Sequence, residues 1–537
     1  METSVGLLIQ KLLETQHRDG WLSDEALKAL SAELGIPLHR LEGLTTFYTH
    51  FRREPPKSVK LEICRDLSCK LAGGAEIHER LLSESTSKEH IEIVEVSCLG
   101  RCDLAPAAAL DEQAVCTRSL KAADLEQASQ DARRAKPETP KAFPSMEIYA
   151  SPEERYGTLR QKLGTEPSTL SAELEKSGLR GMGGAAFPTG RKWGLVAGAP
   201  PGPRHVITNA DESEPGSFKD RQILASLPHL VIEGMALAAY CVGAEEGTLF
   251  IRHEYEPERQ LVQAAIDEAR QLGALGKNIF GSSFSFDIEI FVSPGGYILG
   301  EETALLECLE DRRGEPRNKP PFPGMKGLNE KPTLINNVET LAHATTILHH
   351  GADWWHALGT HEFSGQKFMS VSGDVATPGV HLVPFGTHLG EVLDLCGGMR
   401  EGLPLGAIVP GGASSNFLPP DALDVAVDFD ALSKAGSMLG SGGAVFIAEN
   451  QDLLQAALNI TRFFRNESCG KCVPCRIGTE KAVAMIEEAG ELSDNTYEKL
   501  CSLNDTLART SICGLGQIAL GPILSMARNF PGQRSDG

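Results

Sequence analysis

Two tight groups of cysteines are the residues with the most distinctive chemistry in this chain of 537 residues. The first group combines C-x4-C (Cys64 and Cys69) with C-x3-C (Cys98 and Cys102). Four thiolates at these spacings suit a flat [2Fe–2S] cluster, because each pair can bind one iron. A structural zinc site is the alternative, although zinc sites usually use the shorter C-x2-C spacing.

The second group is C-x2-C-x2-C, which places three thiols close together at Cys469, Cys472 and Cys475. These thiolates cannot all reach one tetrahedral ion comfortably, but they can bind three corners of a [4Fe–4S] cubane. Cys513 is the predicted fourth ligand, since Gly514 and Gly516 would let backbone N–H groups approach the cluster sulfurs. Cys501, expected in the middle of a helix, is the alternative. The remaining cysteines are predicted to be plain core residues: Cys116, Cys241, Cys308, Cys396 and Cys501.

The stretch from Gly178 to Trp193 (GLRGMGGAAFPTGRKW) leaves the backbone almost bare of side chains. Backbone N–H groups at Gly181, Gly183 and Gly184 could converge on a phosphate or approach a ring closely. A helix after this loop would add the positive end of its dipole. The stretch matches neither G-x-G-x-x-G nor the Walker pattern, so by itself it is either a cofactor loop or a flexible turn.

Polar clusters in the middle of the chain favour the cofactor loop. They lie at residues 207–221, 293–307, 316–328 and 333–340. The first directly follows a predicted strand, where α/β sheets bind ligands. A solvated turn is the alternative for each cluster alone, but their gathering around one glycine loop argues against it. Carboxylates and carboxamides suit ribose hydroxyls and flavin edges, and Phe187 and Phe322 could stack on rings.

The elements that must position these residues fall into several domains, because a single hydrophobic core does not grow to this length. Residues 1 to about 50 are expected to be helical. Strands at 59–64 and 91–98 around a helix at 75–82 predict a small α/β domain with its metal site at the strand ends. The polar, proline-bearing segment 131–145 is typical of a linker.

Residues 178–340 alternate strands with helices, which favours a mostly parallel sheet covered by helices. The expected strands are 205–210, 247–252 and 286–292, and the expected helices are 223–243 and 257–273. Residues 363–450 predict a small strand-rich insert with strands at 367–373, 406–412 and 444–450. From residue 451 onward the pattern is helical.

Composition narrows the classes of partner. The formal net charge of −21 argues against nucleic acid and against an anionic membrane surface, both of which attract basic proteins. The first 20 residues lack the apolar segment of a signal peptide, and no apolar run is long enough to span a bilayer. Clustered cysteines in such a chain indicate metal ligands in a reducing compartment, so we expect a cytoplasmic protein without direct membrane insertion.

Several motifs together resemble one family: ITNADESEPGSFKDR, YILGEETAL, KPPFP, INNVET and ESCGKCVPCR. They are similar to the flavin-bearing NADH-oxidising subunit of respiratory complex I, and to the diaphorase subunits of NAD-dependent hydrogenases and formate dehydrogenases. The resemblance covers residues 150–530. Residues 1–130 resemble the thioredoxin-like [2Fe–2S] subunit that accompanies it, here fused in one chain, as is common in the hydrogenase and formate dehydrogenase relatives.

The resemblance implies an α/β multidomain fold. The implied parts are an N-terminal helical segment (1–50), a thioredoxin-like [2Fe–2S] domain (51–133), a linker (134–155), a Rossmann-like FMN/NAD(H) domain (156–362), a ubiquitin-like β-grasp insert (363–450) and a C-terminal helical bundle with the [4Fe–4S] cluster (451–537).

The resemblance also implies the roles of individual residues. FMN would lie on Gly181, Gly183 and Gly184, with Lys192 near its phosphate. The residues implied to hold its ribityl chain and ring are Asn209, Asp211, Glu212, Tyr297, Gly300, Glu301, Asn336 and Asn337. The residues implied to bind and align NAD(H) are Phe187, Phe322, Lys319, Glu214 and Glu302. Hydride transfer needs no acid or base from the protein, so alignment is the expected task.

Three departures from the family pattern stand in the same region. Met182 replaces an arginine and Ala186 a glycine in the glycine loop, and Leu299 replaces a cysteine. We expect the first two to change flavin potential or nucleotide affinity. Glu214 predicts NAD(H) over NADP(H), because a carboxylate near the adenosine ribose accepts hydroxyl hydrogen bonds and repels a 2′-phosphate.

The expected function is an NAD(H)–FMN diaphorase subunit that serves the catalytic or iron–sulfur subunit of a larger complex. The expected parent complex is an NAD-dependent formate dehydrogenase or a hydrogenase. A fused NADH-dehydrogenase subunit of complex I is an alternative, and an electron-bifurcating subunit is another. A zinc-bound assembly scaffold is the non-enzymatic alternative.

Overall fold

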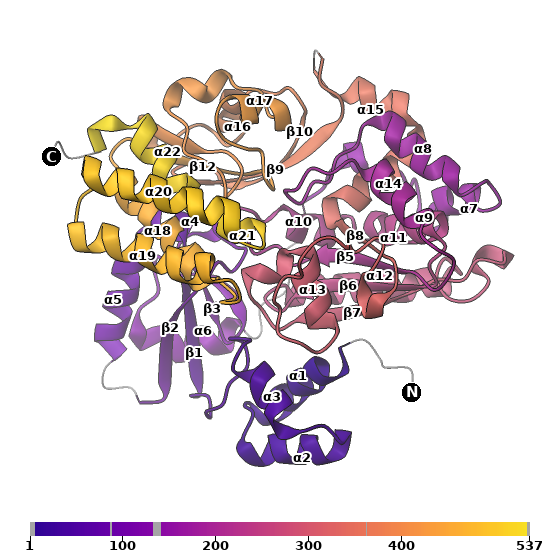
Figure 1. Ribbon diagram of the computed structural model, residues 1–537, viewed down its shortest axis with the longest axis horizontal. Coiled ribbons are helices and arrows are strands. Elements are labelled where there is room, and N and C mark those ends of the chain that lie inside the picture. Colours follow the sequence, from indigo (N-terminus) through magenta and orange to yellow (C-terminus); the bar gives the residue numbers. More distant parts are fainter. Residues whose placement is uncertain (1–5, 86–88, 133–140, 361, 534–537) are drawn as a thin grey trace.

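The computed structural model describes residues 6–85, 89–132, 141–360 and 362–533. Residues 1–5 of the expected N-terminal helical segment and residues 134–140 of the expected linker lie outside the described residues. In the described residues, three four-stranded sheets form the framework, and helices surround them (Figure 1). The fold is α/β and multidomain, as the sequence predicts.

The N-terminal helices are α1 (Leu7–Asp19), α2 (Asp24–Leu34) and α3 (Leu38–Thr45). Ser23 caps α2 by accepting a hydrogen bond from the backbone of Ala26, as its position before Asp24 and Glu25 leads one to expect. The Ile9 N–H donates to Asp311 (3.0 Å), and the Tyr48 hydroxyl donates to the Arg312 carbonyl (2.6 Å). These helices therefore pack directly on the central domain.

The first sheet belongs to the small N-terminal α/β domain. Its strands are β1 (Val59–Cys64), β2 (Ile91–Val96), β3 (Ala107–Leu110) and β4 (Gln113–Cys116), in the order β2-β1-β3-β4. Among the described strands of this sheet, β1 and β2 pair in parallel and the other pairs are antiparallel. The helices are α4 (Leu67–Leu71), α5 (Gly74–Ser85) and α6 (Leu125–Ala132). The cysteine pairs follow β1 and β2, where the sequence pattern predicts the metal site.

The central sheet is fully parallel, as expected, in the order β7-β6-β5-β8. Its strands are β5 (His205–Ala210), β6 (Glu246–Arg252), β7 (Asp287–Ser293) and β8 (Thr333–Asn337). The helices of this domain are α7 (Gly157–Lys162), α8 (Ser168–Ser177), α9 (Thr189–Ala197), α10 (Lys219–Ser226), α11 (Pro228–Val242), α12 (Glu256–Gln271), α13 (Glu302–Leu309), α14 (Val338–His350) and α15 (Ala352–Leu358).

Two features of this domain differ from the sequence-based expectation. The single helix expected at 223–243 is two helices, α10 and α11, bent by 94°. Pro228 begins α11, and proline cannot continue a helix because it lacks an N–H and clashes with the preceding turn. Strand β8 is not among the expected strands. It is only five residues long, and its last two residues are asparagines, which are uncommon in strands.

The third sheet forms the strand-rich insert, in the order β10-β9-β12-β11. Its strands are β9 (Gln366–Gly373), β10 (Gly379–Pro384), β11 (Leu405–Val409) and β12 (Gly443–Ala448), with helices α16 (Leu389–Leu395) and α17 (Phe429–Lys434). Lys367 at the start of β9 is fully buried and donates to Glu339 of α14 (2.6 Å), which also pairs with the buried Lys219 (3.0 Å). Buried charges thus join the insert to the central domain.

The C-terminal part is helical, as predicted. It consists of α18 (Leu453–Asn466), α19 (Val473–Ala489), α20 (Asp494–Thr510), α21 (Gly514–Ile518) and α22 (Gly521–Asn529). Helix α18 packs against α19 and α22 and also contacts α4 of the N-terminal domain. The C-terminal helices therefore lie beside the N-terminal domain although they are far apart in sequence (Figure 1).

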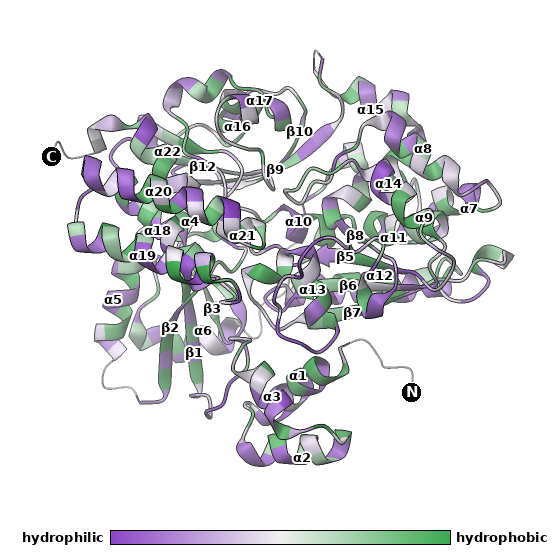
Figure 2. Cartoon of the chain, in the orientation of Figure 1, coloured by the Kyte–Doolittle hydropathy of each residue, from purple (hydrophilic) through white to green (hydrophobic). Residues whose placement is uncertain are grey.

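The peripheral helices α2, α5 and α20 carry both hydrophilic and hydrophobic residues (Figure 2), and the buried residues of the molecule are mainly apolar. Helix α11 is the most apolar and is buried along nearly its whole length. Within the described part of the chain, no single helix has the length and apolar composition to cross a membrane; only the bent pair α10–α11 meets that test together.

Candidate cofactor and electron-transfer site

Polar residues gather at the carboxyl edge of the central sheet. The connections from β5 to β6 and from β6 to β7 run in one direction, whereas β8 lies on the other side of β5. This order creates a switch point between β5 and β8, and ligands of parallel α/β sheets bind at such points. The acidic residues from Asp211 to Glu214 follow β5, and Asn336 and Asn337 end β8.

The glycine loop lies over this switch point. Its base is closed by the Gly181 N–H, which donates to the Phe187 carbonyl (2.9 Å). A Cβ atom at Gly183 would lie only 3.0 Å from the Cβ of Asn337, so the loop approaches β8 as closely as a glycine permits. Gly184 has φ +121° and faces open space. Helix α9 begins directly after the loop, so a bare backbone and a helix N-terminus are available to a phosphate.

The residues after β5 differ in the direction of their side chains. Asn209 donates to the Gly300 carbonyl (2.9 Å), which ties β5 to the loop after β7. Burial raises the pKa of Asp211 to about 6, while hydroxyls of Ser213 and Ser293 donate to its two oxygens. These contacts hold the loop after β5 in a defined shape.

The carboxylate of Glu212 is directed into the protein. Its oxygens accept hydrogen bonds from the backbone N–H groups of Asp220 and Arg221, at the start of α10, and from the Tyr255 hydroxyl (3.1 Å). A carboxylate at a helix N-terminus is stabilised by the free N–H groups and the helix dipole. Glu212 therefore shapes the site from behind, a role that the sequence pattern alone did not distinguish.

Glu214 is held from two domains. It accepts a hydrogen bond from the Tyr297 hydroxyl (2.6 Å) and another from the backbone N–H of Ser414 (2.6 Å). Burial raises its pKa, and these two donors oppose that rise. Ser414 belongs to the insert, where Gly412 packs so closely that a Cβ would lie 2.6 Å from the Glu214 side chain. This contribution of the insert was not expected from the sequence, although its Pro-Gly-Gly turn is a signal of close backbone approach.

Two lysines and two glutamates form an ionic cluster beside the glycine loop. Lys319 donates to Glu301 (2.9 Å) and to Glu302 (3.1 Å), and Lys192 lies 3.6 Å from Glu302. Glu301 also caps α13 by accepting from the N–H groups at its start. Although burial opposes its ionisation, Glu302 has a lowered pKa because both lysines lie beside it. The cluster therefore presents fixed charges of both signs.

Aromatic and amide groups complete the site. Asn336 accepts a hydrogen bond from the Trp193 indole N–H (3.0 Å), and Asn337 caps α14 and donates to Asp220 (2.6 Å). Phe187 is 41% exposed and Phe322 is 59% exposed. Both rings are therefore accessible for stacking on the ring of a bound molecule.

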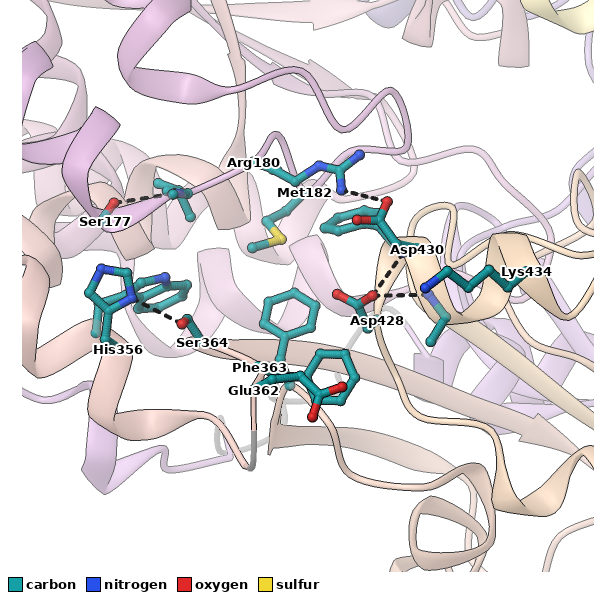
Figure 3. A pocket seen from close by; sticks show the side chains of 16 residues that line it. Ser177, Arg180, Met182, His356, Glu362, Phe363, Ser364, Asp428, Asp430 and Lys434 are labelled. Atoms are coloured by element: carbon teal, nitrogen blue, oxygen red, sulfur yellow. Dashed lines mark hydrogen bonds and ion pairs between the residues drawn. The ribbon is translucent and has the colours of Figure 1, made fainter.

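A cavity of about 540 Å³ lies behind the glycine loop, between that loop and the insert. Figure 3 shows Met182 among its lining residues, close to Arg180, which pairs with Asp430 (3.1 Å). None of the residues implied to bind cofactors lines this cavity. The Met182 side chain therefore points away from the acidic loop (Asp211 to Glu214). The backbone of Met182 is the part of this residue that faces the site.

The four thiols of the first group lie together. Cys64, Cys69, Cys98 and Cys102 are each at most 3% exposed. The Cys98 and Cys102 sulfurs are 3.6 Å apart, and Cys64 lies in hydrogen-bond contact with Cys69 and Cys98. Four buried thiols gathered in this way fit a [2Fe–2S] cluster, in which two thiolates bind each iron. Cys116, expected in the core, is instead exposed because it ends the edge strand β4.

The second thiol group also gathers. Cys475 and Cys513 interact electrostatically with each other and with Cys469. Burial raises the pKa of Cys475 and of Cys513 to about 11. Cys513 is the N-cap of α21, and the N–H groups of Leu515 and Gly516 point toward it. The buried Ser511 hydroxyl beside Gly516 has no hydrogen-bond partner among the described residues. These donors fit a [4Fe–4S] cluster, whose sulfurs accept such hydrogen bonds. Cys501 lies within α20, only partly buried.

Glu467 connects all three sites. It accepts a hydrogen bond from the Ser97 hydroxyl, next to Cys98, and a second from the backbone N–H of Tyr297 (2.9 Å). It also stands two residues before Cys469. A single carboxylate thus touches the segments that carry both thiol groups and the polar edge of the central sheet.

Three models of known domains match consecutive parts of the chain. Residues 2–131 match the thioredoxin-like [2Fe-2S] ferredoxin, residues 174–346 the Nuo51 FMN-binding domain, and residues 455–536 the NADH-ubiquinone oxidoreductase-F iron-sulfur binding region. The two iron–sulfur regions contain the two thiol groups, and the FMN-binding domain contains the switch point described above.

Whole proteins of known type are similar as well. The NADP-reducing hydrogenase subunit HndC of Solidesulfovibrio fructosivorans is 41% identical over 70% of this chain and 77% of its own length. An F-type NADH-quinone oxidoreductase subunit of Rhizobium meliloti is 42% identical over 70% of this chain and 90% of its own. A chain of the NAD+-reducing [NiFe]-hydrogenase in its air-oxidized state superposes with a TM-score of 0.86 and 29% identity, over 100% of this chain and 94% of that chain.

Substitution of the predicted fourth cubane ligand tests the second thiol group. Cys513→Ala is expected to remove about four irons per chain, because a cubane with three thiolates is lost more readily than one with four. Iron and acid-labile sulfide analysis with electron paramagnetic resonance (EPR) measures this loss. Cys501→Ala is the matched control and should keep its iron. The reverse pattern would make Cys501 the ligand.

Ala186 offers a second test, because it has φ +54°. A left-handed conformation costs an alanine about 1 kcal/mol, which a glycine does not pay. Ala186→Gly is therefore expected to raise the thermal midpoint of the FMN-loaded chain by about 2 °C. Ala185→Gly is the control, since Ala185 is exposed and is not in the left-handed region. An equal rise in both variants would contradict the strain at Ala186.

Proposed function

This chain belongs to the family of F-type NADH-quinone oxidoreductase subunits, and we propose that it is the NAD-dependent electron-transfer subunit of a formate dehydrogenase or a hydrogenase. Membership gives the general activity directly. The chain is an NADH-oxidising oxidoreductase subunit that uses FMN, NAD(H), a [2Fe–2S] cluster and a [4Fe–4S] cluster. The identity of the parent complex and the roles of single residues are the proposal.

When bound, FMN supplies the exchange between two-electron hydride transfer and one-electron transfer to iron–sulfur clusters. The protein's own contribution is binding and alignment. The glycine loop and the start of α9 offer N–H groups to a phosphate, and Asn209 and Asn337 fix the polar edge behind it. The exposed rings of Phe187 and Phe322 stack on the nucleotide, while Lys319 holds Glu302 in place beside it.

The thiol groups are proposed as the two cluster sites. The ligands of the [2Fe–2S] cluster are Cys64, Cys69, Cys98 and Cys102, and those of the [4Fe–4S] cluster are Cys469, Cys472, Cys475 and Cys513. The first group is buried, whereas Cys469, Cys472 and Cys513 are partly exposed. The more accessible group is the one better placed to exchange electrons with another subunit.

The extent of the similarity supports the parent complex. The hydrogenase chain of known structure matches this chain along its whole length, at 29% identity. That length includes the N-terminal domain with the first thiol group. A chain that carries both modules is therefore organised like the diaphorase component of a hydrogenase, and formate dehydrogenases share that organisation with hydrogenases in the resemblance described above.

Metal analysis of the native complex tests this proposal. The complex should be purified through this chain, and molybdenum, tungsten and nickel measured by mass spectrometry. Molybdenum or tungsten would identify a formate dehydrogenase, and nickel would identify a hydrogenase. Copurification with quinone-reducing membrane subunits and none of these metals would contradict both and favour complex I.

Nucleotide preference tests the proposed role of Glu214. The wild-type chain is expected to prefer NADH, because the carboxylate repels a 2′-phosphate. Glu214→Gln should shift the ratio of kcat/KM for NADPH over NADH by tenfold or more, which corresponds to about 1.4 kcal/mol. NADH:ferricyanide and NADPH:ferricyanide assays with added FMN measure the ratio.

Tyr297→Phe is the matched control for this test. It removes the hydrogen bond to Glu214 but keeps the charge, so its shift in preference should be several-fold smaller. Comparable kcat/KM values for both nucleotides in the wild-type chain, with no gain for NADPH in Glu214→Gln, would show that Glu214 does not set the preference.

A further inference from the structure

Arg252, the last residue of β6, joins the first thiol group to the acidic loop after β5. It is 3% exposed. Its Nη2 donates to the Cys98 carbonyl (2.7 Å), and its Nη1 donates to the Glu212 carbonyl. One guanidinium therefore holds a proposed [2Fe–2S] ligand residue of one domain and the acidic loop of another.

Glu254 keeps the guanidinium in this orientation. Its two oxygens accept from Nε (2.9 Å) and Nη2 (2.6 Å) of Arg252. Because Arg252 has five N–H donors in a planar fork, these contacts and the two to backbone carbonyls leave little freedom for the group to turn. A buried charge with this many partners is fixed in position.

Tyr255 closes the space beside the guanidinium. The Arg252 guanidinium carbon lies 5.2 Å from the centre of its ring, and its hydroxyl donates to the Glu212 carboxylate. A Cβ atom at Gly100 would lie 2.3 Å from that hydroxyl, so the loop between Cys98 and Cys102 packs tightly against Tyr255. Neither the thiol loop nor the acidic loop can move without disturbing this group.

We propose that Arg252 is a positioning residue for both loops and that its charge raises the reduction potential of the [2Fe–2S] cluster. The proposal rests on the cofactor sites assigned above and does not depend on which complex the chain serves. Reduction adds an electron to the cluster, and a buried cation beside a ligand residue stabilises the reduced form. Its removal also leaves Glu254 and the Cys98 carbonyl dipole uncompensated, which acts in the same direction.

A redox titration of the full-length, cofactor-loaded chain followed by EPR tests the potential. Arg252→Met is expected to lower the equilibrium constant for reduction of the [2Fe–2S] cluster at least tenfold, which equals about 59 mV for one electron. Arg317→Met is the control, because Arg317 is a partly buried arginine that pairs with Glu307 and Glu310 and contacts neither carbonyl. Its change should be less than threefold. Equal changes in both variants would overturn the proposal.

Two further variants separate charge from positioning. Arg252→Lys keeps the charge but offers no planar fork for both carbonyls, so the potential should stay near wild type while the Kd for NAD+ rises at least threefold. Glu254→Gln should raise the potential, because it removes a negative charge from the same place. An unchanged or lowered potential in Glu254→Gln would overturn the electrostatic part, including where Arg252→Met fails to fold. An unchanged Kd in Arg252→Lys would overturn the positioning part.

Discussion

The hydrogen bonds to the Glu212 carboxylate are the interactions on which the site depends most. This carboxylate is buried at the carboxyl edge of the central sheet, where an unpartnered charge would cost several kcal/mol. The N–H groups that begin α10 and the hydroxyls of Ser217 and Tyr255 satisfy it. In satisfying it they fix the start of α10, the course of the acidic loop and the position of Tyr255. The switch point is therefore shaped by the need to partner one carboxylate.

The same requirement governs the contacts between domains. Lys367 of the insert and Lys219 both pair with Glu339, and all three residues are fully buried. Arg101 and Glu258 form a similar pair between the N-terminal domain and the central domain. Removing one member of such a pair costs about 3–5 kcal/mol, because the other is left as a buried charge. Apolar surfaces tolerate sliding, whereas these pairs define one arrangement of the domains around the cofactor sites.

The sequence allowed prediction of those features that rest on local pattern. Local features of this kind depend on neighbouring residues. The structure contains the predicted strands that end at Cys64 and Ala210 and the glycine loop before α9. The direction of a side chain at a strand end depends on distant partners instead. The inward turn of Glu212 needs α10 and Tyr255, and the contact of Ser414 with Glu214 needs the insert folded back on the sheet. A charged residue that ends a buried strand, such as Arg252, can be recognised from the sequence pattern. The residues that it contacts cannot be recognised in this way.

Charged contacts hold the N-terminal domain against the central domain. Arg252 contacts the carbonyl of Cys98, Arg221 pairs with Asp103, and Glu467 accepts from Ser97. Separation of the domains would leave these groups without their hydrogen-bond partners in the other domain. Charged hydrogen bonds are also more directional than apolar contacts, so they hold the thiol loop in one orientation. The position of the first thiol group relative to the switch point of the central sheet is thus set by charged hydrogen bonds that cross the domain boundary, and the covalent link between the domains is not needed to explain it.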